Sequence, residues 1–209
     1  MMTTGNILLL DRSENRDYYS TSDGNFMPLE QSLQAHKGLS RVKWVREWVH
    51  NILSRRHLDV GCKDGYTCLT LQAEGIECVG IDPSSDAVDA ARLKAVQANL
   101  EPVYITSFAE DYVNPKRFDS VSCMEVVEHV TDVDVLLKKL CSLGDHIFIT
   151  TPDAIGRHGM KDAIRNQEHI RLFGKDELNE LCSKYGEVID IQSIDDQLFI
   201  YFIANTDDN

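Results

Sequence analysis

The fold is decided by residues 58–65, which read Leu58-Asp59-Val60-Gly61-Cys62-Lys63-Asp64-Gly65. An apolar run ends in this stretch at a turn with two glycines, and a helical pattern follows the turn. Glycine at positions 61 and 65 permits a positive φ angle and lets a ligand approach the backbone closely. The stretch therefore predicts a strand, a tight turn and a helix, with room for a ligand at the turn.

A second apolar run, Cys78-Val79-Gly80-Ile81, ends in an acidic residue, Asp82. This residue follows Asp59 by 23 positions. In sheets built from alternating strands and helices, an acidic residue about 20 positions past the glycine turn accepts hydrogen bonds from the hydroxyl groups of a ribose. The two features together predict a cofactor that contains a nucleoside.

The order of these residues resembles motif I of the class I S-adenosylmethionine (SAM) methyltransferases, followed by the acidic strand end of that family. The turn does not fit the dinucleotide fingerprint G-x-G-x-x-G, and Lys63 stands where the methyltransferase motif usually has its middle glycine. The resemblance implies SAM as the cofactor. The residues that we expect to bind SAM are Arg41, Asp59, Gly61, Lys63, Gly65, Asp82, Ala109, Glu110 and Met124.

Strand and helix patterns alternate along the rest of the chain. After a helical pattern at residues 28–56, we expect strands at residues 57–60, 78–81, 103–105, 118–124, 146–150, 188–193 and 198–204. Helices are expected at residues 64–74 and 84–99, after Asp132, and at 175–185. The alternation predicts an α/β fold whose doubly wound, mostly parallel sheet has helices on both faces. The last two strands are joined too closely for a helical crossover, so they should pair antiparallel. The methyltransferase resemblance likewise implies a Rossmann-like sheet of seven strands with the last strand antiparallel.

Length and composition narrow the classes of protein. At 209 residues the chain is expected to form a single domain, with residues 1–40 as a mobile or lid-like extension. It has no apolar run of 18 residues, so we expect no membrane span. The net charge of −13 argues against a large nucleic-acid footprint. Six cysteines without a C-x-x-C pair indicate reduced thiols in a cytoplasmic protein.

Side chains suited to catalysis gather at the end of the fourth predicted strand. Glu125 stands at the tip of that strand, and Glu128 and His129 follow in the next turn. In a doubly wound sheet this strand end opens on the same crevice as the glycine turn. His169 lies on the long connection after the fifth strand, over the same edge of the sheet. These four residues could bind one divalent ion such as Mg²⁺ or Mn²⁺. Alternatively, they form local ion pairs or caps without metal, and His129 or His169 then serves as the general base.

The central part of the chain, from Leu58 to about residue 143, resembles the ubiquinone-biosynthesis O-methyltransferases. The likeness rests on Leu-Asp-Val-Gly-Cys, Gly-Ile-Asp and Cys-Met-Glu-Val-Val-Glu-His-Val, and on an upstream Gly-x-Phe-x-Pro-Leu segment at residues 24–29. In that family the Glu-x-x-Glu-His motif is associated with a divalent metal, and an arginine at the position of Arg41 faces the methionine carboxylate of SAM. The same motif with a later histidine also resembles the small-RNA 3′-terminal 2′-O-methyltransferases.

The function that we expect from the sequence is SAM-dependent O-methylation of a small hydroxylated acceptor, with Glu128, His129 and His169 as catalytic residues. One alternative is 2′-O-methylation at the 3′ end of RNA. Four basic residues near His169 would supply positive charge to an RNA: Arg157, Lys161, Arg165 and Arg171. Another alternative is a non-catalytic SAM-binding protein, which Lys63 in the turn keeps open. The sequence specifies neither the acceptor nor an oligomeric state.

Overall fold

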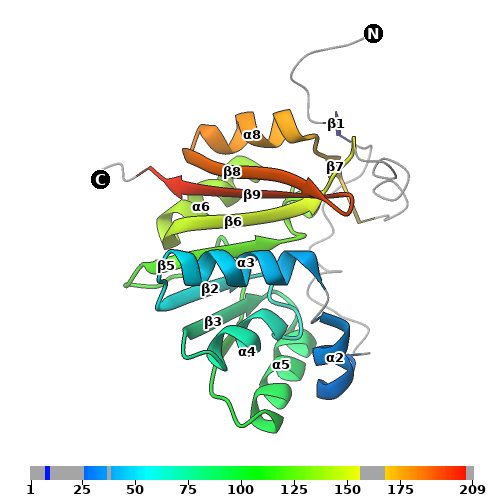
Figure 1. Cartoon of the computed structure of the whole chain (residues 1–209), viewed down its shortest axis with the longest axis vertical. Helices are drawn as coiled ribbons and strands as arrows, with labels where there is room; N and C mark the ends of the chain where they lie inside the picture. Colours follow the sequence, from blue (N-terminus) through cyan, green and yellow to red (C-terminus); the bar gives the residue numbers. More distant parts are fainter. Residues whose placement is uncertain (1–7, 10–25, 37–38, 156–167, 206–209) are drawn as a thin grey trace.

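The computed structural model describes residues 8–9, 26–36, 39–155 and 168–205 of the chain. Seven strands form one sheet in the order β4-β3-β2-β5-β6-β9-β8 (Figure 1). β9 is antiparallel to both of its neighbours, and the other neighbouring pairs are parallel. The strands are β2 (Arg56–Val60), β3 (Glu77–Asp82), β4 (Val103–Thr106), β5 (Phe118–Met124), β6 (Gly144–Pro152), β8 (Gly186–Ile194) and β9 (Gln197–Ala204). The predicted seven-stranded sheet with its last strand antiparallel is therefore confirmed.

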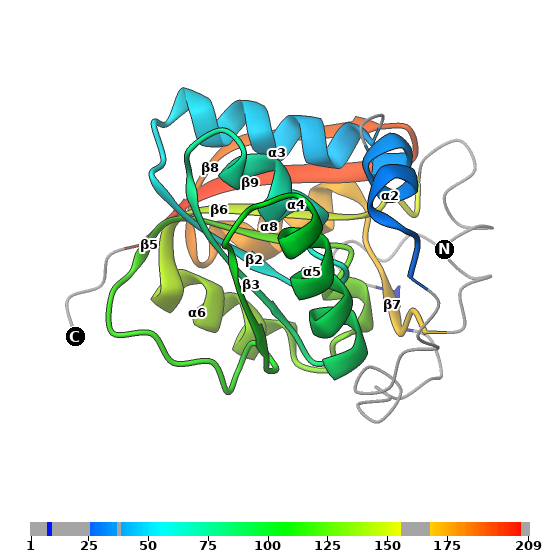
Figure 2. The same ribbon diagram turned by 90° about the horizontal axis from the view of Figure 1, so that it is seen from below.

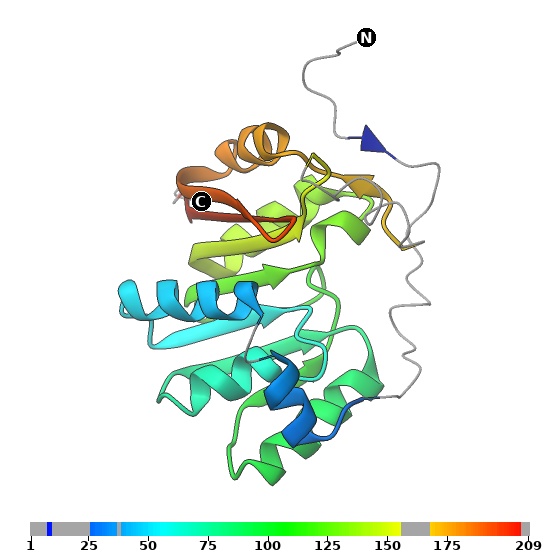
Figure 3. The same ribbon diagram turned by 45° about the vertical axis from the view of Figure 1, so that its right-hand side comes forward.

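Helices cover both faces of this sheet, and each face has its own apolar layer. On one face lie α3 (Ser40–Asn51), α4 (Tyr66–Gln72) and α5 (Ser85–Gln97). On the other face lie α6 (Val133–Leu143) and α8 (Lys175–Ser183). Figure 2 shows α3 and α6 on opposite sides of the sheet. The shorter helix α2 (Leu29–His36) contacts α4 (Figure 3). Among the described parts of the chain, no helix combines the length and the apolar character needed to cross a membrane.

Two tryptophans on α3 explain why this helix lies across the sheet. The ring of Trp44 packs edge-on against Phe148 and Phe199, with ring centroids 5.7 and 5.3 Å apart. Trp48 contacts Tyr201 at a centroid distance of 4.7 Å. Aromatic pairs in such arrangements add to the stabilisation that burial gives. Both side chains thus pack on strands β6 and β9 and fix α3 against the sheet.

The boundaries of two predicted helices were wrong. The helical pattern at residues 28–56 is divided between α2 and α3, and α3 ends at Asn51. Leu53 then adopts a left-handed conformation with a φ angle of 55°, and β2 begins at Arg56. The helix predicted at residues 64–74 is shorter, because Gly65 has a φ angle of 81° and still belongs to the turn.

A small second sheet joins two segments that lie far apart in the sequence. β1 (Leu8–Leu9) pairs antiparallel with β7 (Arg171–Leu172), on the connection between β6 and α8. The sequence predicted neither strand. Residues 1–7, 10–25, 37–38 and 156–167, which include most of the predicted lid-like extension, lie outside the described residues.

Candidate active site

The turn between β2 and α4 contains three residues with a left-handed backbone. The φ angles are 73° at Gly61, 49° at Lys63 and 81° at Gly65. Glycine adopts this conformation without steric cost, whereas for a residue with a Cβ atom it costs about 1–2 kcal/mol. Lys63 therefore keeps the conformation that a glycine in motif I favours. Its N–H group donates a hydrogen bond to Asp82 Oδ2 at 2.9 Å, which holds the strained residue in place.

Three other N–H groups of this turn also donate within the protein. Those of Gly61 and Cys62 donate to the Ile81 carbonyl at 2.9 and 3.0 Å, and that of Gly65 donates to the Cys62 carbonyl at 2.9 Å. These donors are already satisfied. The turn thus offers a ligand close contact with its backbone at Gly61, which lines the crevice and has no side chain.

Gly65 supports the turn by packing beneath it. The hydroxyl group of Tyr104 donates to the Gly65 carbonyl at 2.9 Å. A Cβ atom at position 65 would lie 2.5 Å from Tyr104 Oη and 2.8 Å from Ala91 Cβ. Gly65 is not among the residues that line the crevice described below. The structure therefore gives Gly65 a packing role beneath the turn.

Replacing Gly65 with alanine is expected to destabilise the folded protein by about 2–5 kcal/mol. Left-handed strain of about 1–2 kcal/mol adds to crowding of about 1–3 kcal/mol. Gly75→Ala is a matched control, because Gly75 has a φ angle of 88° but an added Cβ would meet nothing within 4 Å. Urea unfolding of both variants measures the difference. Equal losses of stability would show that Tyr104 and Ala91 accommodate the extra atom.

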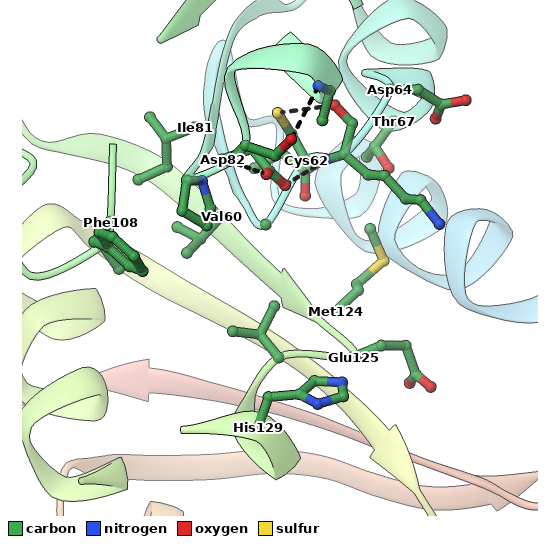
Figure 4. A pocket seen from close by; sticks show the side chains of 18 of the residues that line it. Val60, Cys62, Asp64, Thr67, Ile81, Asp82, Phe108, Met124, Glu125 and His129 are labelled. Carbon is green, nitrogen blue, oxygen red and sulfur yellow. Dashed lines mark hydrogen bonds between the residues drawn. The ribbon is translucent and has the colours of Figure 1, made fainter. Parts of the chain in front are cut away.

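A crevice of about 600 Å³ opens beside the turn, at the carboxyl ends of β2, β3 and β5. Figure 4 shows Asp82 on one side of it and His129 on the other. Eight of the nine residues predicted to bind SAM line this crevice: Arg41, Asp59, Gly61, Lys63, Asp82, Ala109, Glu110 and Met124. Phe26, Thr67 and Ser107 also line it and were not predicted to bind the cofactor. Thr67 follows the glycine turn by only two residues, and this closeness to the turn could have predicted that it lines the crevice.

Asp82 is fixed at the tip of β3 by two backbone donors. Its Oδ2 accepts from Lys63 N and its Oδ1 from Ser84 N, each at 2.9 Å (Figure 4). Burial raises the pKa of this carboxyl group above its usual value, and the two hydrogen bonds oppose that effect. Each carboxylate oxygen has a second lone pair. Asp82 is thus oriented by the protein and can still accept hydrogen bonds from a ligand.

Asp59 lies deeper, at the floor of the crevice. It is 2% exposed, and it accepts a hydrogen bond of 2.6 Å from the hydroxyl group of Ser122 on β5. Burial raises its pKa to about 7, against the opposing hydrogen bonds from Ser122 and Thr67. A carboxyl group with this pKa changes its charge near neutral pH. Ser122 was not predicted as a site residue.

Glu125 does not join the other predicted metal ligands. It has a left-handed φ angle of 56°, so the chain does not continue from it as a helical turn. Its side chain accepts hydrogen bonds from Thr150, at 3.0 Å, and from Gln197. The prediction that Glu125 and Glu128 share one face assumed a regular helical turn. The 3₁₀ turn η1 begins only at Val127 and ends at His129.

The structure brings together Glu128, His129 and His169, which we name the Glu128 cluster. One ligand atom from each residue can be chosen so that all three atoms lie within 4.8 Å of one another. The two imidazole rings have centroids 4.8 Å apart. His169 reaches this position because the next residue, Ile170, donates its N–H to the Glu128 carbonyl at 2.9 Å. Three of the four predicted ligands are thus neighbours, although they come from segments about 40 residues apart.

Glu128 has the least exposed carboxyl group within the described part of the chain. It is 1% exposed, and its Oε2 accepts a hydrogen bond from Thr151 at 2.9 Å. Its Oε1 has no hydrogen-bond partner among the described residues and lies 3.8 Å from His129 Nε2. Burial, together with the nearby Glu125, raises the pKa of Glu128 well above its usual value. A buried oxygen without a partner costs free energy unless a proton or a cation compensates it.

The hydrogen bonding of His129 indicates which ring nitrogen carries the proton. Nδ1 lies 3.1 Å from the Glu168 carbonyl, which can only accept, so Nδ1 is the donor. Burial lowers the pKa of His129, which favours the neutral ring. Nε2 then has the lone pair, on the side of Glu128. His129 lines the crevice itself, whereas Glu128 and His169 lie behind it.

Comparison with known proteins finds relatives among the O-methyltransferases. The chain is 33% identical to the ubiquinone biosynthesis O-methyltransferase of Vibrio atlanticus over 134 residues, which are 62% of this chain and 54% of that protein. The corresponding protein of Serratia proteamaculans is 30% identical over 134 residues, again 62% of this chain and 54% of that protein. The chain therefore spans about half the length of these relatives.

Solved structures show the same fold at low sequence identity. Magnesium protoporphyrin IX methyltransferase from Synechocystis PCC 6803, with bound S-adenosylhomocysteine, has a TM-score of 0.71 and 15% identity, over 91% of this chain and 98% of that one. A Burkholderia thailandensis N1-methyltransferase of 1,6-didemethyltoxoflavin has a TM-score of 0.66 and 14% identity, over 85% and 84%. The predicted Rossmann-like methyltransferase fold is confirmed.

A family model described as a methyltransferase domain matches residues 34–189. The match includes the glycine turn, Asp82, and all three members of the Glu128 cluster. The family predicted from the motifs around residues 58–65 and 125–129 is thus confirmed. The chain belongs to the methyltransferase domain family, and it has the fold of methyltransferases that were solved with bound SAM or S-adenosylhomocysteine.

Proposed function

We propose that the protein transfers the methyl group of SAM to an oxygen atom of a small hydroxylated acceptor. The observation that carries the proposal is the crevice, with Asp82 on one side and His129 on the other (Figure 4). Asp82 suits a ribose, and His129 suits the deprotonation of a hydroxyl group. The O-methyltransferase names of the relatives from Vibrio and Serratia support oxygen as the methyl acceptor.

The proposed cofactor contacts follow from charge and hydrogen bonding. SAM supplies a methyl group that its sulfonium already activates. Asp82 has lone pairs left for the two ribose hydroxyl groups. Arg41, near the start of α3, carries a permanent positive charge and suits the methionine carboxylate. Ala109 and Glu110 line the part of the crevice that we assign to adenine.

We further propose that the Glu128 cluster holds one divalent ion beside the acceptor. One carboxylate and two imidazoles form a donor set that divalent ions use in proteins. The unpartnered Oε1 of Glu128 supports this role, because an ion would compensate its burial. A divalent ion lowers the pKa of a hydroxyl group bound to it. In the absence of an ion, His129 Nε2 is the base that we propose for the acceptor proton.

The RNA alternative receives less support. Arg157, Lys161 and Arg165 lie outside the described residues. Arg171 is only 7% exposed, and one of its Nη groups donates to the Thr131 carbonyl. Its positive charge is therefore buried and is not presented to an RNA at the surface. The net charge of −13 also opposes a long RNA footprint.

We also propose a cytoplasmic location. All six cysteines are free, and five of them are buried. Free thiols are typical of reducing compartments.

Asp82→Ala is expected to weaken SAM binding by about 1–3 kcal/mol, which is about 5- to 150-fold in Kd, because it removes charged hydrogen bonds to the ribose. Isothermal titration calorimetry measures this change. Asp89→Ala is the control, because Asp89 is an exposed carboxylate on α5 outside the crevice. Unchanged affinity in Asp82→Ala would remove Asp82 from the site.

An untargeted labelling experiment can identify the acceptor. The protein is incubated with methyl-labelled SAM and either a metabolite extract or a panel of catechols, sugars and short RNAs. Mass spectrometry then identifies the labelled product. A labelled O-methyl group on a small molecule supports the proposal. Label on RNA alone, lost at high salt, favours the RNA alternative. SAM binding without any labelled product favours a non-catalytic protein.

A further inference from the structure

Four polar side chains share one face of the two central strands β2 and β5. The strands are parallel neighbours, with His57 opposite Ser120 and Asp59 opposite Ser122. Alternate residues of a strand point to the same face. His57 and Asp59 therefore share a face with the two serines. The residues between them, such as Leu58 and Val121, are apolar and belong to the core of the opposite face.

Together with Ser54, these four side chains form one continuous line of hydrogen bonds, which we name the His57 chain. Ser54 Oγ lies 2.8 Å from Ser120 Oγ, which lies 2.7 Å from His57 Nδ1. On the other side of the ring, His57 Nε2 lies 2.8 Å from Ser122 Oγ, and Ser122 Oγ lies 2.6 Å from Asp59 Oδ1. His57, Ser120 and Ser122 are 0% exposed, Asp59 is 2% and Ser54 is 7%. The line thus runs inside the protein from the far end of the sheet to the floor of the crevice.

For the three hydrogen bonds between Ser120 and Asp59, the group that donates can be deduced from the protons that each side chain carries. The ionised carboxylate can only accept, so the Ser122 hydroxyl donates to it. That hydroxyl has no second proton, so Ser122 Oγ accepts from His57 Nε2–H. The neutral ring then has its lone pair on Nδ1, which accepts from the Ser120 hydroxyl. All these donors point towards Asp59, and successive bonds of this kind strengthen one another.

Asp59 is where this chain meets the proposed cofactor, because it is the only member that lines the crevice. Buried polar groups at the centre of a sheet cost free energy unless every partner is present. Apolar residues at the positions of His57 and the serines would avoid this cost in free energy. We propose that His57 is a positioning residue that, through Ser122, orients Asp59 and keeps it anionic, so that Asp59 attracts a cationic group of SAM. This inference rests on the proposed function only in that SAM occupies the crevice.

Among the groups that face Asp59, the hydroxyl groups of Ser122 and Thr67 are the hydrogen-bond donors that favour its anion. The charge of Asp82 on β3 disfavours the anion of Asp59. The thiols of Cys62 and Cys123 and the phenol of Tyr104 face Asp59 from the turn, β5 and β4, and burial raises their pKa values, so they stay neutral. On α4, the hydrogen bond with Cys78 and burial raise the pKa of the Cys68 thiol, so it stays neutral as well. Asp64 forms an ion pair with Lys94. Burial lowers the pKa of His57 to about 3, so His57 acts as a neutral donor and not as a cation.

The test is the pH dependence of SAM binding. In the wild type, affinity should fall as the pH is lowered through about 7, where Asp59 gains a proton. His57→Phe removes the donor to Ser122, so the anion of Asp59 is less stable. The pH at which the affinity falls should then be about one unit higher than in the wild type. Relative to the wild type, the Kd of His57→Phe for SAM should be raised about 5- to 10-fold near pH 7 and should agree within about twofold near pH 9. The α-amino group of SAM itself titrates near pH 8, but it does so equally for every variant.

Two further variants separate positioning from packing. His57→Gln retains a donor for Ser122 and an acceptor for Ser120, so it should restore the wild-type profile. Ser122→Ala removes the direct donor and should shift the profile as His57→Phe does, which keeps the test available if the phenylalanine variant does not fold. His146→Phe is the control, because it removes a similar bond of 2.7 Å to Tyr201 in the same sheet, away from the crevice. Its profile should match the wild type.

The outcomes distinguish the two proposals. Absence of SAM binding to the wild type at every pH would overturn the proposed function. SAM binding whose pH profile is the same in the wild type, His57→Phe and Ser122→Ala would overturn the role of His57. A shift in His57→Phe that glutamine does not reverse would also overturn it, because the loss would then come from packing. A shift in both donor-lacking variants, reversed by glutamine, establishes it.

Discussion

Replacing Glu128 with alanine is expected to lower the rate of methyl transfer at least about 100-fold, the scale of a lost metal ligand or general base. The affinity for SAM should change by no more than about twofold, because Glu128 lies behind His129 and does not line the crevice. The expectation rests on the unpartnered Oε1 beside His129 and on the closeness of His169. Single-turnover kinetics with the identified acceptor separate the transfer step from SAM binding, which calorimetry measures.

Glu177→Ala is the matched control for this variant. Glu177 on α8 also has a carboxylate oxygen, Oε2, that is buried without a hydrogen-bond partner in the described part of the protein. It does not belong to the Glu128 cluster and does not line the crevice. A loss of turnover in both variants would therefore point to general destabilisation. A loss in Glu128→Ala alone assigns the effect to the cluster.

Treatment with EDTA then separates the two roles proposed for the cluster. If it holds an ion, EDTA should abolish turnover of the wild type, and Mg²⁺ or Mn²⁺ should restore it, whereas Glu128→Ala should not recover. Turnover that survives EDTA undiminished contradicts the metal proposal and leaves His129 as the preferred base. In that case His129→Gln should lower the rate by about 100-fold or more, because the amide cannot accept the acceptor proton.

The parts of the fold that could be predicted are those that local patterns encode. The apolar runs of β2, β3 and β5 each end at a glycine turn or an acidic residue, which marks the end of the strand. The alternation of these strands with helices implies that they pair in parallel. Boundaries were harder, because the sequence does not reveal that Leu53 and Gly65 end or delay a helix through a left-handed backbone. The pairing of β1 with β7 was not predictable, because two residues carry no periodicity.

The site was predictable where its residues follow one strand directly. Asp82 and Met124 lie at strand ends and His129 lies in the turn η1 that follows β5, and the sheet order brings all three to one crevice. Glu125 was misjudged, because its left-handed φ angle interrupts the turn that would have placed it beside Glu128.

The His57 chain was missed for a different reason. The alternations His-x-Asp and Ser-x-Ser are visible in the sequence at residues 57–59 and 120–122. Their meaning appears only in the register of β2 against β5, which pairs residues about 60 positions apart. Polar alternation on two strands that are otherwise apolar is the signal that could have found it.

Asp59→Asn is expected to stabilise the protein without ligand by about 1–4 kcal/mol near pH 8, while it weakens SAM binding about 10-fold. Burial raises the pKa of Asp59 to about 7 in the folded protein, whereas the unfolded chain releases this proton near pH 4. Between these values the folded state binds more protons than the unfolded state. The free energy of unfolding therefore falls as the pH rises from about 4 to about 7, and the loss is complete above that range.

Asparagine removes this loss because it does not titrate. It keeps a carbonyl oxygen that can accept from Ser122 at the position of Asp59 Oδ1. The stability difference between variant and wild type should thus be small near pH 4 and grow as the pH approaches about 8, as urea unfolding at several pH values would measure. Asp119→Asn is the control on the same pair of strands: the carboxylate of Asp119 is exposed, and no gain in stability with pH is expected.

The two expected changes have opposite signs, and that opposition is what tests the role of the charge. Asp59 lowers the stability of the folded protein when it is ionised inside the sheet. This cost is explained if the negative charge attracts a cationic group of SAM when SAM binds. A gain in stability together with unchanged SAM affinity would mean that the anion is not used, and it would contradict the role assigned to His57 as well. A loss of both stability and affinity would mean that Asp59 is held mainly by its hydrogen bonds to Ser122 and Thr67. Greater stability with weaker binding is the result that the buried position of Asp59 and its place at the crevice predict together.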